Sequence, residues 1–135
     1  MITTWSLRLP RLPDPALSPN KASHQHWRKR QTAAKSDVTY AHAFALQEGK
    51  LPGMPWTEAW VTITFSKRLT KQGAAYKRHQ DLDNLGASAK SFIDGVVLAG
   101  ILIDDSIIQA ITYQWNDGLS GPATEIDIEG GDGIT

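Results

Sequence analysis

Apolar residues recur at every second position in two separate segments of this chain. In residues 3–9 and 60–65 they alternate with polar residues, and this period of two is typical of a β-strand with one buried face. Strand-forming apolar residues also dominate residues 107–115 and 123–129. The pattern predicts four strands at 3–9, 60–65, 107–115 and 123–129. The alternating residues are Trp5, Leu7 and Leu9 in the first segment and Val61, Ile63 and Phe65 in the second.

Two longer segments show the spacing of a helix instead. Residues 22–48 favour a helix that Gly49 and Pro52 would end, and residues 84–98 carry an apolar stripe that stops at Gly100. Asp83 is suited to cap the second helix. The apolar positions are Trp27, Ala34, Val38, Ala41 and Ala45 in the first helix and Leu85, Ala89, Phe92, Ile93, Val96 and Val97 in the second.

The order of these elements is β, α, β, α, β, β, which predicts one compact α/β domain with a mixed sheet and two main helices over residues 1–130. The prolines between residues 10 and 19 favour an extended loop before the first helix. Residues 131–135 are expected to form a disordered tail.

The composition restricts the chemistry. The chain has no cysteine, which excludes disulfides, thiolate metal sites and cysteine nucleophiles. It also lacks a long apolar stretch, so we expect a cytoplasmic protein without a membrane partner.

The net charge of zero hides a strong asymmetry. Residues 1–80 hold 13 Lys and Arg against 4 Asp and Glu, a charge of +9, whereas residues 81–135 hold 1 against 10, a charge of −9. This division suggests a basic surface for a polyanion beside an acidic cluster for cations. The alternative is that both halves form ordinary solvated faces.

The sequence Asp81-Leu82-Asp83 is the first candidate for chemistry. On an extended segment its two carboxylates leave the same face, with α-carbons about 6 to 7 Å apart. Mg²⁺ often takes only one or two protein carboxylates together with phosphate oxygens, and an acid at Asp104 or Asp105 would add a third. Such an ion activates water for phosphodiester hydrolysis. The motif alone is weak, because Asp83 also has the structural role of a helix cap.

Lys90 is the one Lys or Arg after residue 78. In an ideal helix it lies about 20° in azimuth and roughly 10 Å along the axis from Asp83. There its charge would reach a scissile phosphate or a departing oxygen. An ordinary salt bridge to Asp94, four residues later, is the alternative role.

Taken together, the DLDN motif, the helix with Lys90 and Asp94, and the sequence LAGILIDD that ends at Asp105 resemble the RusA family of Holliday junction resolvases. The resemblance extends from Trp5 to about Ile128, and its specific part is residues 81–105. It implies that Asp81, Asp83 and Asp105 bind Mg²⁺, with Mn²⁺ as an alternative ion, and that Lys90 supports catalysis. The segment between Asp83 and Lys90 is about three residues longer than is usual in that family, which affects the expected position of Lys90.

The resemblance also implies a homodimer that binds a four-way DNA junction and nicks two opposed strands symmetrically during recombination or repair. The predicted strand at 107–115 has enough apolar residues to form the dimer interface. Candidate phosphate-binding residues are Arg28, Lys29, Arg30, Lys67, Arg68, Lys71, Lys77 and Arg78. For residues 67–78 a flexible DNA-contacting loop is favoured over a hairpin turn.

Several residues keep a structural interpretation at this stage. Trp27, Trp56, Trp60 and Trp115 are expected to pack in the core, although each side chain is also of a type that stacks on unpaired bases. His24, His26 and His79 are expected to be surface or capping residues, and Asp104 has no assigned role.

Two other function classes remain open. A binding module that keeps the fold without cleavage would bind junctions but produce no nicks with any divalent ion. A metal-dependent phosphohydrolase acting on nucleotides would retain its activity after charge reversal at residues 28–30, whereas a junction nuclease would lose binding.

Overall fold

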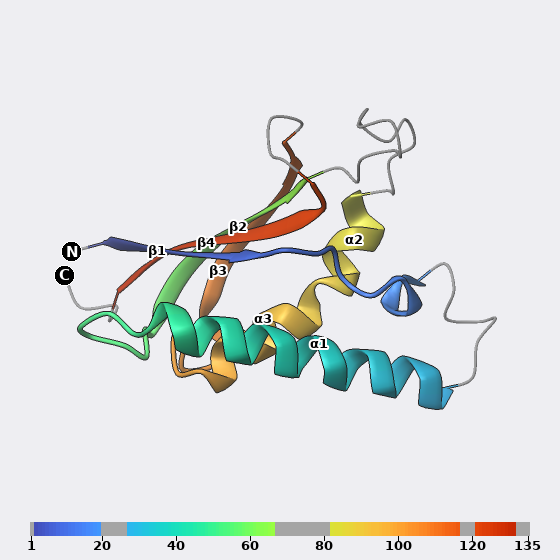
Figure 1. Ribbon diagram of the computed structural model, residues 1–135. Coiled ribbons are helices and arrows are strands. Elements are labelled where there is room, and N and C mark those ends of the chain that lie inside the picture. The colour runs from blue at the N-terminus through green and yellow to red at the C-terminus, as the bar shows by residue number, and fades with distance from the viewer. Residues whose placement is uncertain (1, 20–26, 67–81, 117–120, 132–135) are drawn as a thin grey trace.

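The computed structural model describes residues 2–19, 27–66, 82–116 and 121–131. Its helices lie against one face of a four-stranded mixed sheet (Figure 1), which confirms the predicted α/β fold class. The elements, in chain order, are β1 Thr3–Leu9, η1 Pro15–Leu17, α1 Trp27–Glu48, β2 Glu58–Ser66, α2 Leu82–Ser88, α3 Lys90–Leu98, η3 Asp105–Ile107, β3 Ile108–Trp115 and β4 Ala123–Gly131.

The strands are ordered β1-β4-β2-β3 across the sheet. β4 pairs antiparallel with both β1 and β2, whereas β2 and β3 are parallel. Parallel neighbours need a crossover connection, and α2 and α3 lie in the connection from β2 to β3. This topology makes β3 an edge strand beside the helices of that crossover.

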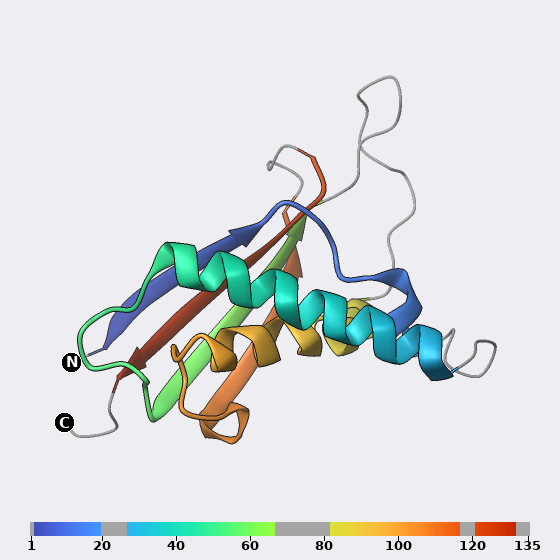
Figure 2. The same ribbon diagram turned by 60° about the horizontal axis from the view of Figure 1, so that its bottom comes forward.

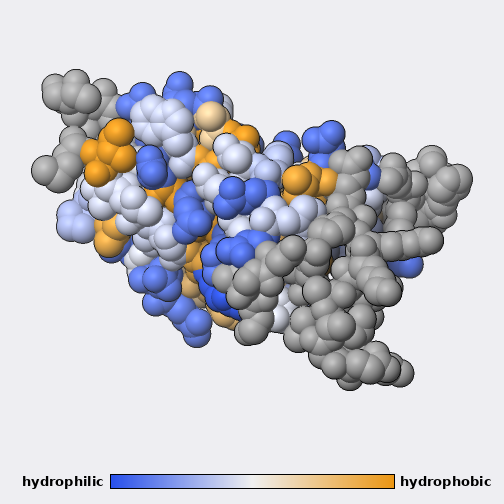
Figure 3. Space-filling model, turned by 90° about the horizontal axis from the view of Figure 1, so that it is seen from above, coloured by the Kyte–Doolittle hydropathy of each residue, from blue (hydrophilic) through white to orange (hydrophobic). Residues whose placement is uncertain are grey.

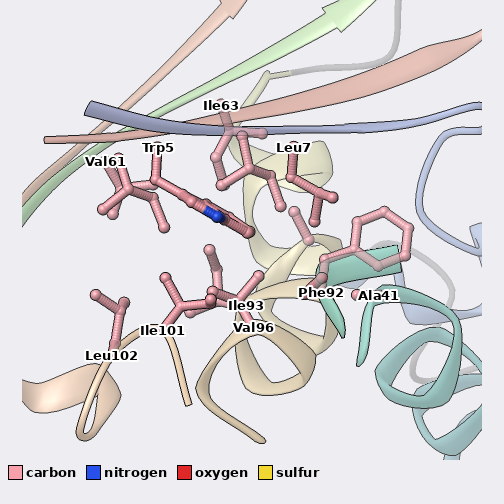
Figure 4. Close-up of a cluster of buried hydrophobic side chains, with 14 of the residues drawn as sticks. Trp5, Leu7, Ala41, Val61, Ile63, Phe92, Ile93, Val96, Ile101 and Leu102 are labelled. Carbon is pink, nitrogen blue, oxygen red and sulfur yellow. The ribbon is translucent and has the colours of Figure 1, made fainter. Parts of the chain in front are cut away.

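The face of the sheet that α1 and α3 cover holds the hydrophobic core. Figure 2 shows α1 running across the strands on this side, and Figure 4 shows side chains of β1 and β2 pointing toward those of α3. The alternation in the strand sequences therefore corresponds to one buried and one open face. Core residues include Trp5, Leu7, Val61, Ile63, Phe92, Ile93, Val96, Ile126 and Ile128.

On the opposite face of the sheet, which no helix of the described residues covers, hydrophilic side chains predominate, with apolar patches among them (Figure 3). On it, Arg8 forms a 3.1 Å salt bridge with Glu125, and the Ser6 hydroxyl donates a 2.6 Å hydrogen bond to Asp127. Glu129 continues this row of acidic residues along β4.

The last strand is longer than the sequence pattern predicts. Gly130 pairs with Thr3 and Gly131 with Glu58, so Gly131 belongs to the sheet and not to a tail. Gly130 has a specific packing role, because a Cβ at this position would collide with the ring of Trp56. Of the predicted tail, residues 132–135 lie outside the described residues, as do residues 22–26 of the first predicted helix.

The single helix predicted over residues 84–98 is two helices, with the break at Ala89. The amide of Ala89 donates to the carbonyls of both Leu85 and Gly86, at 2.9 and 3.2 Å, and its ψ of −6° departs from the helical value. The side chain of Ala89 is fully buried, which explains why the apolar spacing continues through the break. Gly86 admits Tyr113, since a Cβ there would lie 2.6 Å from the tyrosine ring.

A buried ion pair attaches the loop after β1 to α1. Asp37 is fully buried, and its carboxylate accepts hydrogen bonds from Arg11 at 2.6 Å and from the Asp14 amide at 2.9 Å. The Arg11 guanidinium lies 4.0 Å from the centre of the Tyr40 ring. Burial raises the pKa of Asp37, and the Asp14 amide and the Arg11 charge oppose that rise. These contacts hold η1 beside the first half of α1.

α1 and α3 approach closely at Gly95. A Cβ on Gly95 would lie 2.5 Å from the carbonyl oxygen of Val38 and 2.8 Å from the Cβ of Ala41. Ala41 and Ala45 are fully buried on α1. Small residues thus set the distance between these two helices.

No helix in the described part of the chain combines the length and apolar character that crossing a bilayer requires.

We expect Gly95→Ala to destabilise the fold by about 1 to 3 kcal/mol, because the added methyl group must push α1 and α3 apart. Helix propensity alone favours alanine over glycine by about 1 kcal/mol, so net destabilisation would isolate the steric effect. Urea unfolding followed by circular dichroism measures the change. Leu98→Ala, on an exposed side chain of α3, is the control and should change stability by about 0.5 kcal/mol at most. A Gly95→Ala protein as stable as the wild type would contradict the close contact.

Candidate functional site

A pocket of about 310 Å³ lies between the α2–α3 break, η3 and β3. Two of its lining residues are charged: Lys90, the first residue of α3, and Asp105, the first residue of η3. The structure therefore brings these two predicted site residues together. We call this the site pocket, and its lining is Ile63, Gly86, Ala87, Ala89, Lys90, Ile93, Asp105, Ile108, Ile111 and Tyr113.

A second hollow of about 420 Å³ separates the first half of α1 from the same α2–α3 break. We call it the helix groove, and it is lined by Leu17, Trp27, Arg30, Gln31, Ala34, Ala87, Ser88, Lys90, Ser91 and Asp94. Ala87 and Lys90 line both the groove and the site pocket. The two hollows are thus neighbours that share one cation.

Asp94 lies within electrostatic range of Lys90 and Asp105. Burial raises the pKa of the Asp94 carboxyl, the positive charge of Lys90 lowers it, and the negative charge of Asp105 raises it. The described residues contain two salt bridges, Arg8–Glu125 and Arg11–Asp37, so Lys90 and Asp94 do not form the ordinary salt bridge that their spacing permits. Lys90 instead faces both hollows.

The two consecutive acids at the start of η3 differ in their surroundings. The carboxylate of Asp104 accepts a 2.6 Å hydrogen bond from the Ser106 hydroxyl. That bond, together with the amides of Asp105 and Ser106, lowers the pKa of Asp104. Asp104 thus takes part in a local turn, whereas Asp105 lines the site pocket.

Asp83 lies beyond the end of the site pocket. It is exposed in the first turn of α2, one residue inside the helix and not at the cap that its sequence position suggested. Gly86 and Ala87, three and four residues later, line the pocket, so Asp83 is about one turn, or roughly 5 Å, farther along the same side of the helix. The break at Ala89 also invalidates the ideal-helix angle between Asp83 and Lys90.

Asp81 lies outside the described residues. Within the described ranges, no three His, Cys, Asp or Glu side chains gather closely enough to hold a metal ion by themselves. The donor chemistry still fits Mg²⁺ or Mn²⁺, because Asp83 and Asp105 offer carboxylates and Mg²⁺ commonly needs only one or two of them beside phosphate oxygens.

The first turn of α1 carries part of the predicted phosphate-binding set. Arg28 and Lys29 are exposed, whereas Arg30 is half-buried and donates a 3.3 Å hydrogen bond to the carbonyl of Ala16. The remaining candidates lie outside the described residues, as does the loop predicted for residues 67–78. These candidates are Lys67, Arg68, Lys71, Lys77 and Arg78, and the three histidines His24, His26 and His79 are outside as well.

The exposure of Trp27 contradicts its predicted position in the core. Its side chain is 58% exposed and lines the helix groove. The buried row of α1 recurs every four residues from Ala33 to Ala45, and Trp27 precedes Ala33 by six residues, which places it roughly 120° away around the helix. The run Arg28-Lys29-Arg30 directly after it was the sequence signal for a solvated face. Trp56 is buried, whereas Trp60 and Trp115 are half-buried.

Comparison of the chain with known protein families finds no matching family profile, and comparison with curated proteins finds no match either.

The charges of Lys90 and Asp105 should move the pKa of Asp94 in opposite directions. Lys90→Met is expected to raise this pKa, because a neighbouring positive charge is lost, and Asp105→Asn is expected to lower it, because a negative charge is lost. NMR titration of the Asp94 carboxyl carbon measures both shifts. Asp127→Asn, on the opposite face of the sheet, is the control and should leave this pKa unchanged. Shifts in the same direction, or no shift in either variant, would contradict the arrangement of the three charges.

Proposed function

We propose that the protein is a Mg²⁺-dependent endodeoxyribonuclease of the RusA type, which resolves four-way DNA junctions by paired symmetric nicks in recombination and repair. The observation that carries this proposal is the site pocket, whose lining contains both Lys90 and Asp105. Asp83 lies outside this lining, about one helical turn farther along α2. These residues are far apart in sequence, yet they are the ones that the family resemblance assigns to the reaction.

The residues have distinct roles in this proposal. Asp81, Asp83 and Asp105 would hold Mg²⁺, which when bound supplies an activated water and stabilises the leaving oxygen. The Lys90 ammonium group offsets the negative charge that develops on the phosphate during cleavage. Lys90 is exposed beside the apolar residues Ile63 and Ile93 of the pocket lining, so its ammonium group is accessible to a phosphate.

The distribution of charge supports an approach of DNA from the helix side. Glu125, Asp127 and Glu129 lie on the open face of the sheet, where they repel a phosphate backbone. The basic residues Arg28 and Lys29 begin α1, which covers the other face. The site pocket is lined by Ile63 from that same covered face, so phosphate-binding residues and the site share one side of the molecule.

A homodimer accounts for paired nicks, since two-fold symmetry provides two equivalent sites. β3 suits the interface because it is an edge strand whose outer backbone groups have no neighbouring strand in the described sheet. Ile111 on β3 is 40% exposed and also lines the site pocket. An interface along β3 would therefore place the two sites near the two-fold axis.

Metal-dependent nicking is the central test. Asp81→Asn, Asp83→Asn and Asp105→Asn should each abolish nicking of a labelled four-way junction in Mg²⁺ while sparing binding, because each removes a metal ligand more than a phosphate contact. Denaturing gels score nicks, and native gels in EDTA score binding. Asp127→Asn removes a carboxylate from the open sheet face and is the matched control, which should cut normally.

The same assay separates the other function classes. Junction binding without nicks in any divalent ion would indicate a binding module, and release of phosphate from nucleotides without junction binding would indicate a phosphohydrolase. Normal cutting by all three variants would show that the assigned carboxylates are wrong.

Ile111→Lys is expected to shift the protein from dimer to monomer, because a charge at an interface on β3 would lose its hydration without gaining a partner. Sedimentation velocity at micromolar concentration measures the state. Leu98→Lys, at a 63% exposed position on α3, is the control and should remain a dimer. A wild-type protein that sediments as a monomer would remove the dimer from the proposal.

A further inference from the structure

The helix groove has the size and lining of a site for a small planar group. Its volume of about 420 Å³ falls within the roughly 300 to 1,000 Å³ that is usual for small-molecule sites. Leu17, Ala34 and Ala87 supply apolar surface, while Gln31 and Ser91 supply polar groups. The indole of Trp27 is the largest side chain in this lining.

The groove lies at one end of the contact between α1 and α3, whose closest approach is at Gly95. The helices are held together at Gly95 and Ala41, and the groove opens beside residues of α1 that lie two turns and more before that contact. Trp27 is the first residue of α1 and is 58% exposed. The Arg28 guanidinium lies 5.5 Å from the centre of the Trp27 ring, which adds positive charge to the aromatic surface.

The groove lies next to the site pocket, with Ala87 and Lys90 in the lining of both. Lys90 lines both hollows, and in the proposed function its ammonium group contacts the scissile phosphate. A nucleotide adjacent to that phosphate would therefore lie at the groove. Arg30, which donates a hydrogen bond to the Ala16 carbonyl, is the second cation in the groove lining.

We propose that the helix groove receives one unstacked base of the cleaved strand, which stacks on Trp27 next to the site pocket. This inference rests on the proposed nuclease function and names the subsite that recognises the substrate strand. The groove lining holds two cations, Arg30 and Lys90, against one carboxylate, Asp94, and Arg28 adds a positive charge beside Trp27. This excess of positive charge favours part of a nucleic acid as the occupant, and the exposed indole favours a base as the group that it stacks on.

The subsite also explains how one fold would distinguish branched from linear DNA. Drawing a base out of an intact duplex costs stacking and pairing energy, and this cost is smallest where the base is already poorly stacked, as at the crossover of a junction. Stacking on Trp27 would then offset the small cost of unstacking a base at a junction, but not the larger cost of unstacking and unpairing a base in a linear duplex. Trp27 would act as a specificity-determining residue, not as a catalytic one.

The test compares Trp27→Ala with Trp27→Phe on a four-way junction in EDTA, where binding occurs without cutting. Trp27→Ala should weaken junction binding by about 5- to 150-fold, which is the range that loss of one stacked base corresponds to, and Trp27→Phe should retain most of the affinity. Binding to linear duplex should change much less, so the ratio of junction to duplex affinity falls. Leu98→Ala removes another exposed apolar side chain and should bind as the wild type does.

A set of junctions makes the test specific, in which each junction has one abasic nucleotide at a different position beside the cleavage site. At one position, the wild type and Trp27→Ala should bind the abasic junction equally, because the base that stacks on Trp27 is already missing. An equal loss for Trp27→Ala on every abasic junction, or normal binding by Trp27→Ala to the intact junction, would overturn the subsite. If either result is found while the protein still nicks junctions in Mg²⁺, only the subsite is wrong and the proposed nuclease function stands. If the wild type binds junctions but does not nick them, the nuclease function is wrong, and the effect of Trp27→Ala on binding still tests the subsite.

Discussion

The close contact of α1 and α3 at Gly95 is the constraint on which the arrangement of the functional site depends. Gly95 allows the α3 backbone to approach the Val38 carbonyl and Ala41 of α1 closely. Because α3 begins at Lys90, five residues before Gly95, the contact also sets the position of the one cation in the site pocket. The same contact leaves the first half of α1 separated from the α2–α3 break, which creates the helix groove.

The break at Ala89 gives the site its shape. A continuous helix would carry Lys90 onward from Asp83 at a regular angle, whereas the tighter turn at Ala89 ends α2 and starts α3 at Lys90. Tyr113 of β3 packs against Gly86 just before this turn, so the edge strand and the broken helix enclose the site pocket between them. The residues between Asp83 and Lys90 are thus part of a specific packing arrangement.

The acidic half of the chain separates into two groups that have different consequences for a polyanion. Asp94, Asp104 and Asp105 lie on or next to α3 and η3, near the site pocket, whereas Glu125, Asp127 and Glu129 lie on the open face of the sheet. The second group contributes no ligand to the site and instead makes one face unfavourable for phosphate. Net charge alone therefore could not reveal how the charges are distributed over the surface, since that depends on which side of each strand a residue occupies.

The sequence by itself determined the four strands, the two helical regions and the α/β class, because periods of two and of three to four are local properties of the chain. It also singled out Lys90 and Asp105 through the motif that they share with Asp83. Only the tertiary structure decided that the second helix breaks at Ala89, that Gly131 belongs to a strand, and that Trp27 is exposed. These outcomes depend on contacts between residues distant in sequence, such as Ser6 with Asp127, Tyr113 with Gly86 and α1 with α3, which no local pattern encodes.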